Sequence, residues 1–158
     1  MAPRKRSGRG RTARKTESDP RAIAAVDCER SSDFPIVGVG ASAGGLDAVT
    51  QMLEAVPVNT GMAFILIQHL APKHPSNLAA ILARTTPMSV TEAKDQNSVV
   101  PNHVYVIPPG QDMMISSGRL RLSPREIHGQ HRPIDLFLCS LAQDSKHLAI
   151  AVDLRHWN

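Results

Sequence analysis

Three features are scarce or absent in this 158-residue sequence, and each absence excludes a class of protein. Aromatic side chains make up 3% of the residues, so the core is expected to be aliphatic. The two cysteines, Cys28 and Cys139, form neither a disulfide framework nor a C-x-x-C pair, which favours a reducing cytoplasm. No apolar run approaches the roughly 18 residues of a membrane span, and the N-terminus lacks the apolar segment of a secretory signal.

Acidic side chains are missing from residues 1–15, which hold seven of the 18 Lys and Arg. The remainder has the other 11 basic and all 14 acidic side chains, so it is slightly acidic. We predict a basic disordered tail over residues 1–32, because its first 20 residues offer almost no apolar side chains to offset the entropy of ordering. One domain is predicted over residues 33–158. The tail has no interleaved aromatics to stack on bases, so nucleic acid is not the expected partner.

Apolar runs separated by turn residues predict an α/β fold. Two short, continuously apolar runs, residues 34–39 and 62–67, are typical of strands covered on both faces, and a helical pattern over 43–56 joins them. This βαβ order implies parallel strands and a right-handed crossover, hence a doubly wound, largely parallel sheet. Further predicted elements are a helix over 77–84 with Leu78, Ile81 and Leu82 inward, strands over 88–93 and 99–107, an inserted β-hairpin over 113–122, a helix over 133–143 and a strand over 147–152.

The stretch between the first strand and the first helix carries the candidate chemistry. Gly40-Ala-Ser-Ala-Gly44 fits the G-x-S-x-G pattern, which holds a serine hydroxyl on a sharp strand-to-helix turn. His69 follows the second strand, and the carboxyl ends of parallel strands share one edge of a sheet. Ser42 is therefore a candidate nucleophile and His69 its base, with the backbone amides of Ala43 and Gly44 facing a developing oxyanion. Taken singly, Ser42 could equally be a helix N-cap and His69 an ordinary loop histidine.

The same glycines support a second interpretation. Gly38-x-Gly40-x-x-Ala43 resembles a dinucleotide fingerprint, which also needs an acidic residue at the end of the second strand. No Asp or Glu occurs between Glu54 and Glu92, which argues against a nucleotide cofactor. The histidines have no zinc-ligand spacing, so no metal is expected either.

Four segments of the chain resemble the catalytic domain of bacterial chemotaxis protein-glutamate methylesterases, the CheB family, in the family's order. They are Ile36-Val-Gly-Val-Gly-Ala-Ser-Ala-Gly-Gly-Leu46, Phe64-Ile-Leu-Ile-Gln-His69-Leu, Pro101-Asn-His-Val-Tyr-Val-Ile-Pro-Pro109 and Arg132-Pro-Ile-Asp-Leu-Phe137. The resemblance implies a doubly wound α/β domain that hydrolyses glutamate γ-methyl esters on chemoreceptors and deamidates receptor glutamines without a cofactor. It makes Ser42 the nucleophile and His69 the base. The segments most resemble those of family members that are fused to a methyltransferase module.

The chain departs from the family pattern at its C-terminal end. The family's triad aspartate follows the strand that here starts at His147, in a glycine-rich loop, and no residue of this chain matches it. Asp153 falls within that strand. The resemblance therefore implies a domain without its last strands and helices, and an esterase impaired by the lack of the aspartate. A nucleotide-binding domain and a non-catalytic receptor-binding remnant are the two alternatives.

Overall fold

A computed structural model describes residues 32–42, 44–68, 77–125 and 132–154, so the predicted basic tail, Ala43 and His69 lie outside the described part of the chain. Its centre is a five-stranded sheet in the order β3-β4-β2-β1-β7, in which every neighbouring pair is parallel. The strands are β1 (Ile36–Ala41), β2 (Ala63–Gln68), β3 (Ser89–Glu92), β4 (His103–Val106) and β7 (Ala149–Leu154). The predicted parallel sheet is confirmed.

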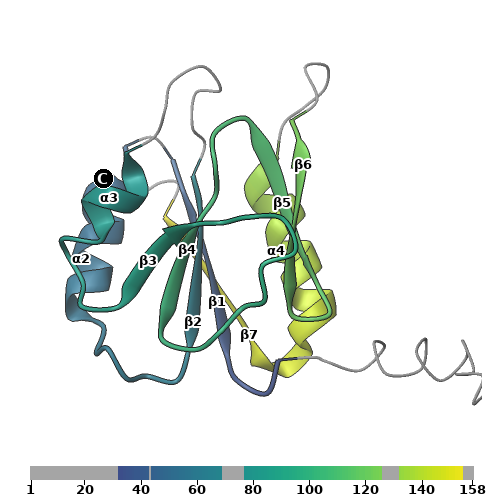
Figure 1. Cartoon of the computed structure of the whole chain (residues 1–158), viewed down its shortest axis with the longest axis horizontal. Helices are drawn as coiled ribbons and strands as arrows, with labels where there is room; N and C mark the ends of the chain where they lie inside the picture. The colour runs from purple at the N-terminus through teal and green to yellow at the C-terminus, as the bar shows by residue number, and fades with distance from the viewer. Residues whose placement is uncertain (1–31, 43, 69–76, 126–131, 155–158) are drawn as a thin grey trace, which may run out of the picture.

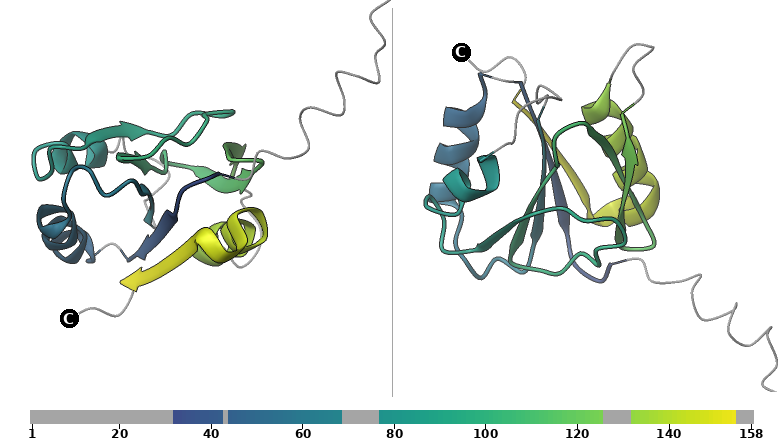
Figure 2. Two further views of the ribbon diagram at one scale, coloured as in Figure 1. Left: turned by 90° about the horizontal axis from the view of Figure 1, so that it is seen from below. Right: turned by 45° about the horizontal axis from the view of Figure 1, so that its top comes forward.

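Both faces of the sheet are covered, as the doubly wound prediction requires (Figure 1). Helices α2 (Leu46–Ala55) and α3 (Leu78–Leu82) pack on one face, where Val49, Leu53 and Leu82 are buried against the strands. Helix α4 (Pro133–Ser145) and the hairpin of β5 (Gln111–Ser116) and β6 (Arg119–Pro124) cover the other. A short 3₁₀ turn, Lys146–Leu148, leads from α4 into β7, which lies at the margin of the sheet in the left view of Figure 2.

The hairpin prediction is confirmed, and the turn residues explain its register. Ser117 and Gly118 both have positive φ, 53° and 67°, as a two-residue hairpin turn of the primed type needs. The Asp144 carboxylate, from the last part of α4, accepts hydrogen bonds from the backbone N–H groups of both residues. This contact fixes the hairpin to the helix at the end of the molecule away from the carboxyl edge of the sheet.

Element boundaries and one inward position differ from the prediction. β1 extends two residues further, through Gly40 and Ala41, because it forms six-residue ladders with both neighbouring strands. α2 begins at Leu46 rather than near residue 43, since a turn intervenes. Ile81 was expected to face inward but is 44% exposed; α3 has only five residues and buries Leu78 and Leu82 instead.

A half-buried histidine at the start of β4 gives a pH prediction. His103 stacks on Tyr105 with ring centroids 4.4 Å apart, and its Nε2 lies 2.9 Å from Thr91 Oγ1. Burial penalises the charged imidazolium and lowers the pKa of His103 below 6.5. The unfolded chain therefore binds a proton at His103 more readily than the folded chain does. The free energy of unfolding consequently decreases as the pH falls below about 6.5.

We expect the urea concentration at the unfolding midpoint to decrease when the pH is lowered from 7.5 to 5.5. The decrease should be smaller in His103→Gln. Equal pH dependence of wild type and His103→Gln would contradict the assignment.

Candidate active site

Ser42 lies on a tight turn directly after β1. Its backbone carbonyl accepts a hydrogen bond from Gly45 N–H at 3.0 Å, which closes the turn, and α2 starts one residue later. Gly45 is the N-cap of α2, and no side chain caps this helix. The interpretation of Ser42 as a helix N-cap is therefore wrong. The half-buried Ser42 sits on a strand–turn–helix elbow, the context that the G-x-S-x-G pattern demands.

The ladder brings the two predicted strand ends together at one edge. Ala41, the residue before Ser42, pairs with Gln68, the residue before His69, and also with Leu154 at the end of β7. The ends of β1, β2 and β7 thus form one row at the carboxyl edge, at the top of Figure 1. His69 itself lies outside the described residues.

One contact at this edge was missed from the sequence. The buried side chain of Gln68 donates from Nε2 to the backbone carbonyl of Ser42 at 3.1 Å. A buried amide needs a hydrogen-bond partner, and the only sequence signal was a polar residue closing an otherwise apolar strand. The contact links the end of β2 to the turn that carries Ser42.

The two glycines after Ser42 differ in their surroundings. A Cβ atom added to Gly44 would meet no heavy atom within 4 Å, so the exposed Gly44 borders open space. At Gly45 the same atom would lie 3.2 Å from Ala41 Cβ, 3.3 Å from Ser42 O and 3.4 Å from Leu154 O. Of the two predicted amide donors, Gly44 is therefore exposed, whereas Ala43 lies outside the described residues.

These surroundings predict that alanine destabilises the protein at Gly45 but not at Gly44. Gly45→Ala should lower the free energy of unfolding by about 1 kcal/mol or more, because three heavy atoms, two of them backbone oxygens, lie within 3.4 Å of the new Cβ. Gly44→Ala should change stability by less than about 0.5 kcal/mol, since space is open and its φ is not positive. Urea unfolding of both variants tests this. Equal destabilisation by the two substitutions would refute it.

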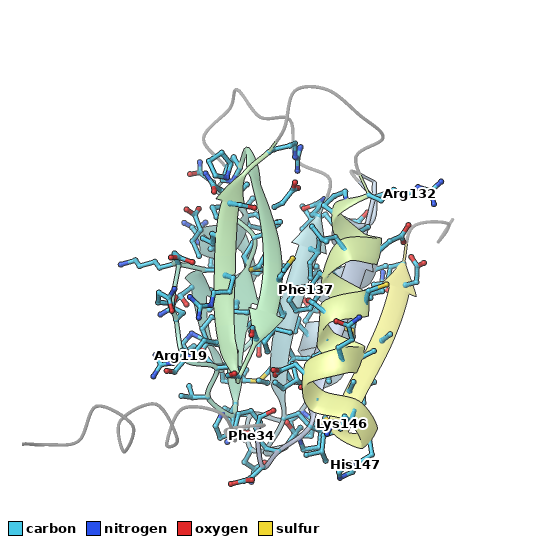
Figure 3. All side chains as sticks on the ribbon, turned by 90° about the vertical axis from the view of Figure 1, so that its right-hand side faces the viewer. Phe34, Arg119, Arg132, Phe137, Lys146 and His147 are labelled. Carbon is cyan, nitrogen blue, oxygen red and sulfur yellow. The ribbon has the colours of Figure 1, made fainter. Side chains whose placement is uncertain are left out.

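Two aspartates of the described residues can be placed relative to this edge. Asp153 lies inside β7, where it pairs with Gly40, as the sequence indicated. Asp144 is bound to the hairpin turn, near the end of α4 that carries Lys146 and His147, whereas Arg132 marks the opposite end of the helix (Figure 3). Within residues 32–154, outside the gaps, no three His, Cys, Asp or Glu side chains gather as a metal site.

The dinucleotide interpretation of Gly38 and Gly40 is wrong. Both glycines lie within β1, not in the turn, and both face α4. A Cβ atom at Gly38 would lie 2.8 Å from Leu138 Cδ2 and 2.9 Å from Leu141 Cδ2, and one at Gly40 would overlap Ile134 Cγ2. The glycines therefore allow α4 to approach the strand, which explains their spacing without a bound phosphate.

No helix of the described residues is long and apolar enough to cross a membrane.

A hollow of about 270 Å³, lined by Ala48, Gln51, Met52 and Leu154, lies between α2 and the end of β7. It adjoins the carboxyl edge on the α2 side of the sheet.

Comparison with known proteins agrees with this geometry. Residues 37–154 match the family model described as CheB methylesterase. The chain is 35% identical over 113 residues to a protein-glutamate methylesterase/protein-glutamine glutaminase of Myxococcus xanthus, covering 68% of this chain and 33% of the relative. For the Pectobacterium atrosepticum protein of the same name, identity is 30%, over 78% of this chain and 36% of the relative.

A solved structure gives the same result. The catalytic domain of the Thermotoga maritima CheB methylesterase superposes with a TM-score of 0.66 at 27% identity, over 77% of this chain and 67% of that one. The chain spans about a third of the length of the curated relatives it matches. From its sequence, its parallel sheet and its serine elbow, this chain belongs to the CheB methylesterase family.

Proposed function

We propose that this chain is a serine hydrolase domain that cleaves γ-methyl esters of glutamate side chains in a receptor protein. The observation that carries the proposal is the elbow. Ser42 lies on a turn after β1, at the carboxyl edge of the sheet and beside the end of the neighbouring strand β2. His69 is the next residue in the sequence after β2. Relatives named as methylesterase and glutaminase supply the substrate class. Deamidation of receptor glutamines is a second reaction of the same site.

In the proposed reaction Ser42 Oγ attacks the ester carbonyl carbon while His69 accepts the hydroxyl proton. The amides of Ala43 and Gly44 stabilise the oxyanion, the bond to the methoxy oxygen breaks, and methanol leaves with the proton from His69. Water then attacks the acyl carbon while His69 accepts a proton from it. His69 passes this proton to Ser42 Oγ as the bond between the acyl carbon and Oγ breaks, and the γ-carboxylic acid product ionises to the carboxylate. No metal or organic cofactor takes part.

We place the reaction in cytoplasmic chemotaxis signalling, with a methylated chemoreceptor as partner and a methyltransferase module as an associated activity.

The test is release of methanol from a receptor peptide that carries a glutamate γ-methyl ester. We expect release of methanol by the chain and irreversible modification of Ser42 by a fluorophosphonate. Binding of the peptide with no methanol release and no modification of Ser42 would refute the hydrolase and leave a receptor-binding module. A rise in melting temperature with nucleotide, without either reaction, would also refute it.

A further inference from the structure

We infer that Gln68 is a positioning residue for the Ser42 elbow. Its side chain is 5% exposed, and its Nε2 donates to the Ser42 carbonyl at 3.1 Å. In the ladder Gln68 stands directly opposite Ala41, so the bond crosses from the last residue of β2 to the residue just past the end of β1. The kinetic part of this inference rests on the proposed function, whereas the structural part does not.

The Ser42 carbonyl accepts hydrogen bonds from two donors, which belong to different elements. Gly45 N–H reaches it at 3.0 Å from within the turn, and Gln68 Nε2 reaches it from the neighbouring strand. The turn bond alone moves with the turn, because both of its groups belong to the same loop. The Gln68 bond ties the carbonyl to the sheet and thereby restricts rotation about the Cα–C bond of Ser42. The Cα that carries the hydroxyl is then held relative to the strand ends.

The chemistry of the position favours glutamine. The side chain must be neutral, because a charge would be nearly fully buried, and it must end in an N–H donor that faces a carbonyl. Leucine has similar size but no donor, so Gln68→Leu leaves the carbonyl with Gly45 alone. An ionised glutamate would oppose one acceptor with another. When protonated, its O–H group could donate as the amide does.

A matched control lies elsewhere in the core. Ser140 on α4 is 9% exposed, accepts a hydrogen bond from Ile115 N–H at 3.1 Å and donates to Phe137 O at 2.7 Å. Ser140→Ala therefore removes a buried side-chain-to-backbone contact between α4 and the hairpin. It should lower the urea midpoint as Gln68→Leu does, but it should not affect the elbow.

The experiment uses the 158-residue chain and two readouts. Hydrogen exchange of the Gly45 amide reports the turn, and the rate of Ser42 modification by a fluorophosphonate reports the hydroxyl. For Gln68→Leu we expect Gly45 exchange to become faster, and Ser42 modification slower, each by about tenfold or more, since small misplacements at a reacting centre are costly. Ser140→Ala should leave both rates unchanged. Gln68→Glu should resemble Gln68→Leu at pH 8 and recover towards wild type at lower pH.

The outcomes separate the inference from the proposed function. Unchanged Gly45 exchange in Gln68→Leu would overturn the inference, whether or not the chain hydrolyses esters. Equal effects of Ser140→Ala on both readouts would also overturn it, because the effect would then be general loss of stability. Faster Gly45 exchange in a chain whose wild-type Ser42 never reacts would support the structural role of Gln68 and refute the hydrolase.

Discussion

Replacing Ser42 with alanine is expected to abolish modification by fluorophosphonates and to lower methanol release by about 10²-fold or more. In subtilisin the loss of the serine costs about 2 × 10⁶ in kcat and the loss of the aspartate alone about 3 × 10⁴. The ratio of these two values, about 10², is the part of the serine's effect that does not depend on the aspartate. The measurements are methanol release and mass-spectrometric detection of the adduct.

The fold should survive this change. Ser42 contributes its backbone carbonyl to the contacts with Gly45 and Gln68, and alanine keeps that carbonyl. We therefore expect a urea midpoint close to that of wild type. The exposed Ser89 on β3 gives a matched control, since Ser89→Ala should preserve both the adduct and the rate. Adduct formation in Ser42→Ala would contradict the assignment of the nucleophile.

The second large effect concerns stability. Gly40→Ala is expected to lower the free energy of unfolding by about 1–3 kcal/mol, because the new Cβ would overlap Ile134 Cγ2 in the packed contact between β1 and α4. Ile134 is buried and β-branched, so its side chain has few alternative rotamers. Gly38→Ala should cost less, since its closest neighbours are the terminal methyl groups of Leu138 and Leu141. Urea unfolding of the two variants gives the comparison.

A double-mutant cycle identifies the cause. Ile134→Ala removes the overlapping methyl group, so Gly40→Ala should cost less in that background, with a coupling free energy of about 1–3 kcal/mol. Leu141→Ala, which instead frees space next to Gly38, should be additive with Gly40→Ala. Additivity of Gly40→Ala with Ile134→Ala would show that the glycine is needed for another reason. A nucleotide-dependent stabilisation lost in Gly40→Ala would restore the fingerprint interpretation.

Local patterns were sufficient for most of the secondary structure. The apolar runs of β1 and β2 are continuous because both faces of these strands are covered, and the Ser117–Gly118 turn required residues that tolerate positive φ. The boundaries were not predictable to the residue, since ladder partners extended β1 through Ala41. The prediction that Ile81 faces inward was wrong, because helical periodicity does not show which side of a five-residue helix packs against the core.

The candidate site divides in the same way. Ser42 and the strand end before His69 were predictable because a G-x-S-x-G turn after a strand has one structural context, and parallel strands end on one edge. The Gln68 contact was not predictable, because it joins residues 26 positions apart through a side chain whose direction depends on packing. The surroundings of Gly45 depend on Leu154 in β7, which lies far along the chain from the turn.

The sequence alone determined the α/β class, the parallel order of β1 and β2, and Ser42 as the candidate nucleophile, because apolar periodicity and turn chemistry act over a few neighbouring residues. Only the tertiary structure decided what the glycines do. Gly38 and Gly40 suited both a phosphate-binding turn and a close helix contact, and the packing of α4 on β1 selected the second. Gly45 serves the turn, and Gly44 borders open space beside Ser42. A glycine has no side chain whose chemistry indicates a role, so its role can be recognised only from the residues that surround it in the fold.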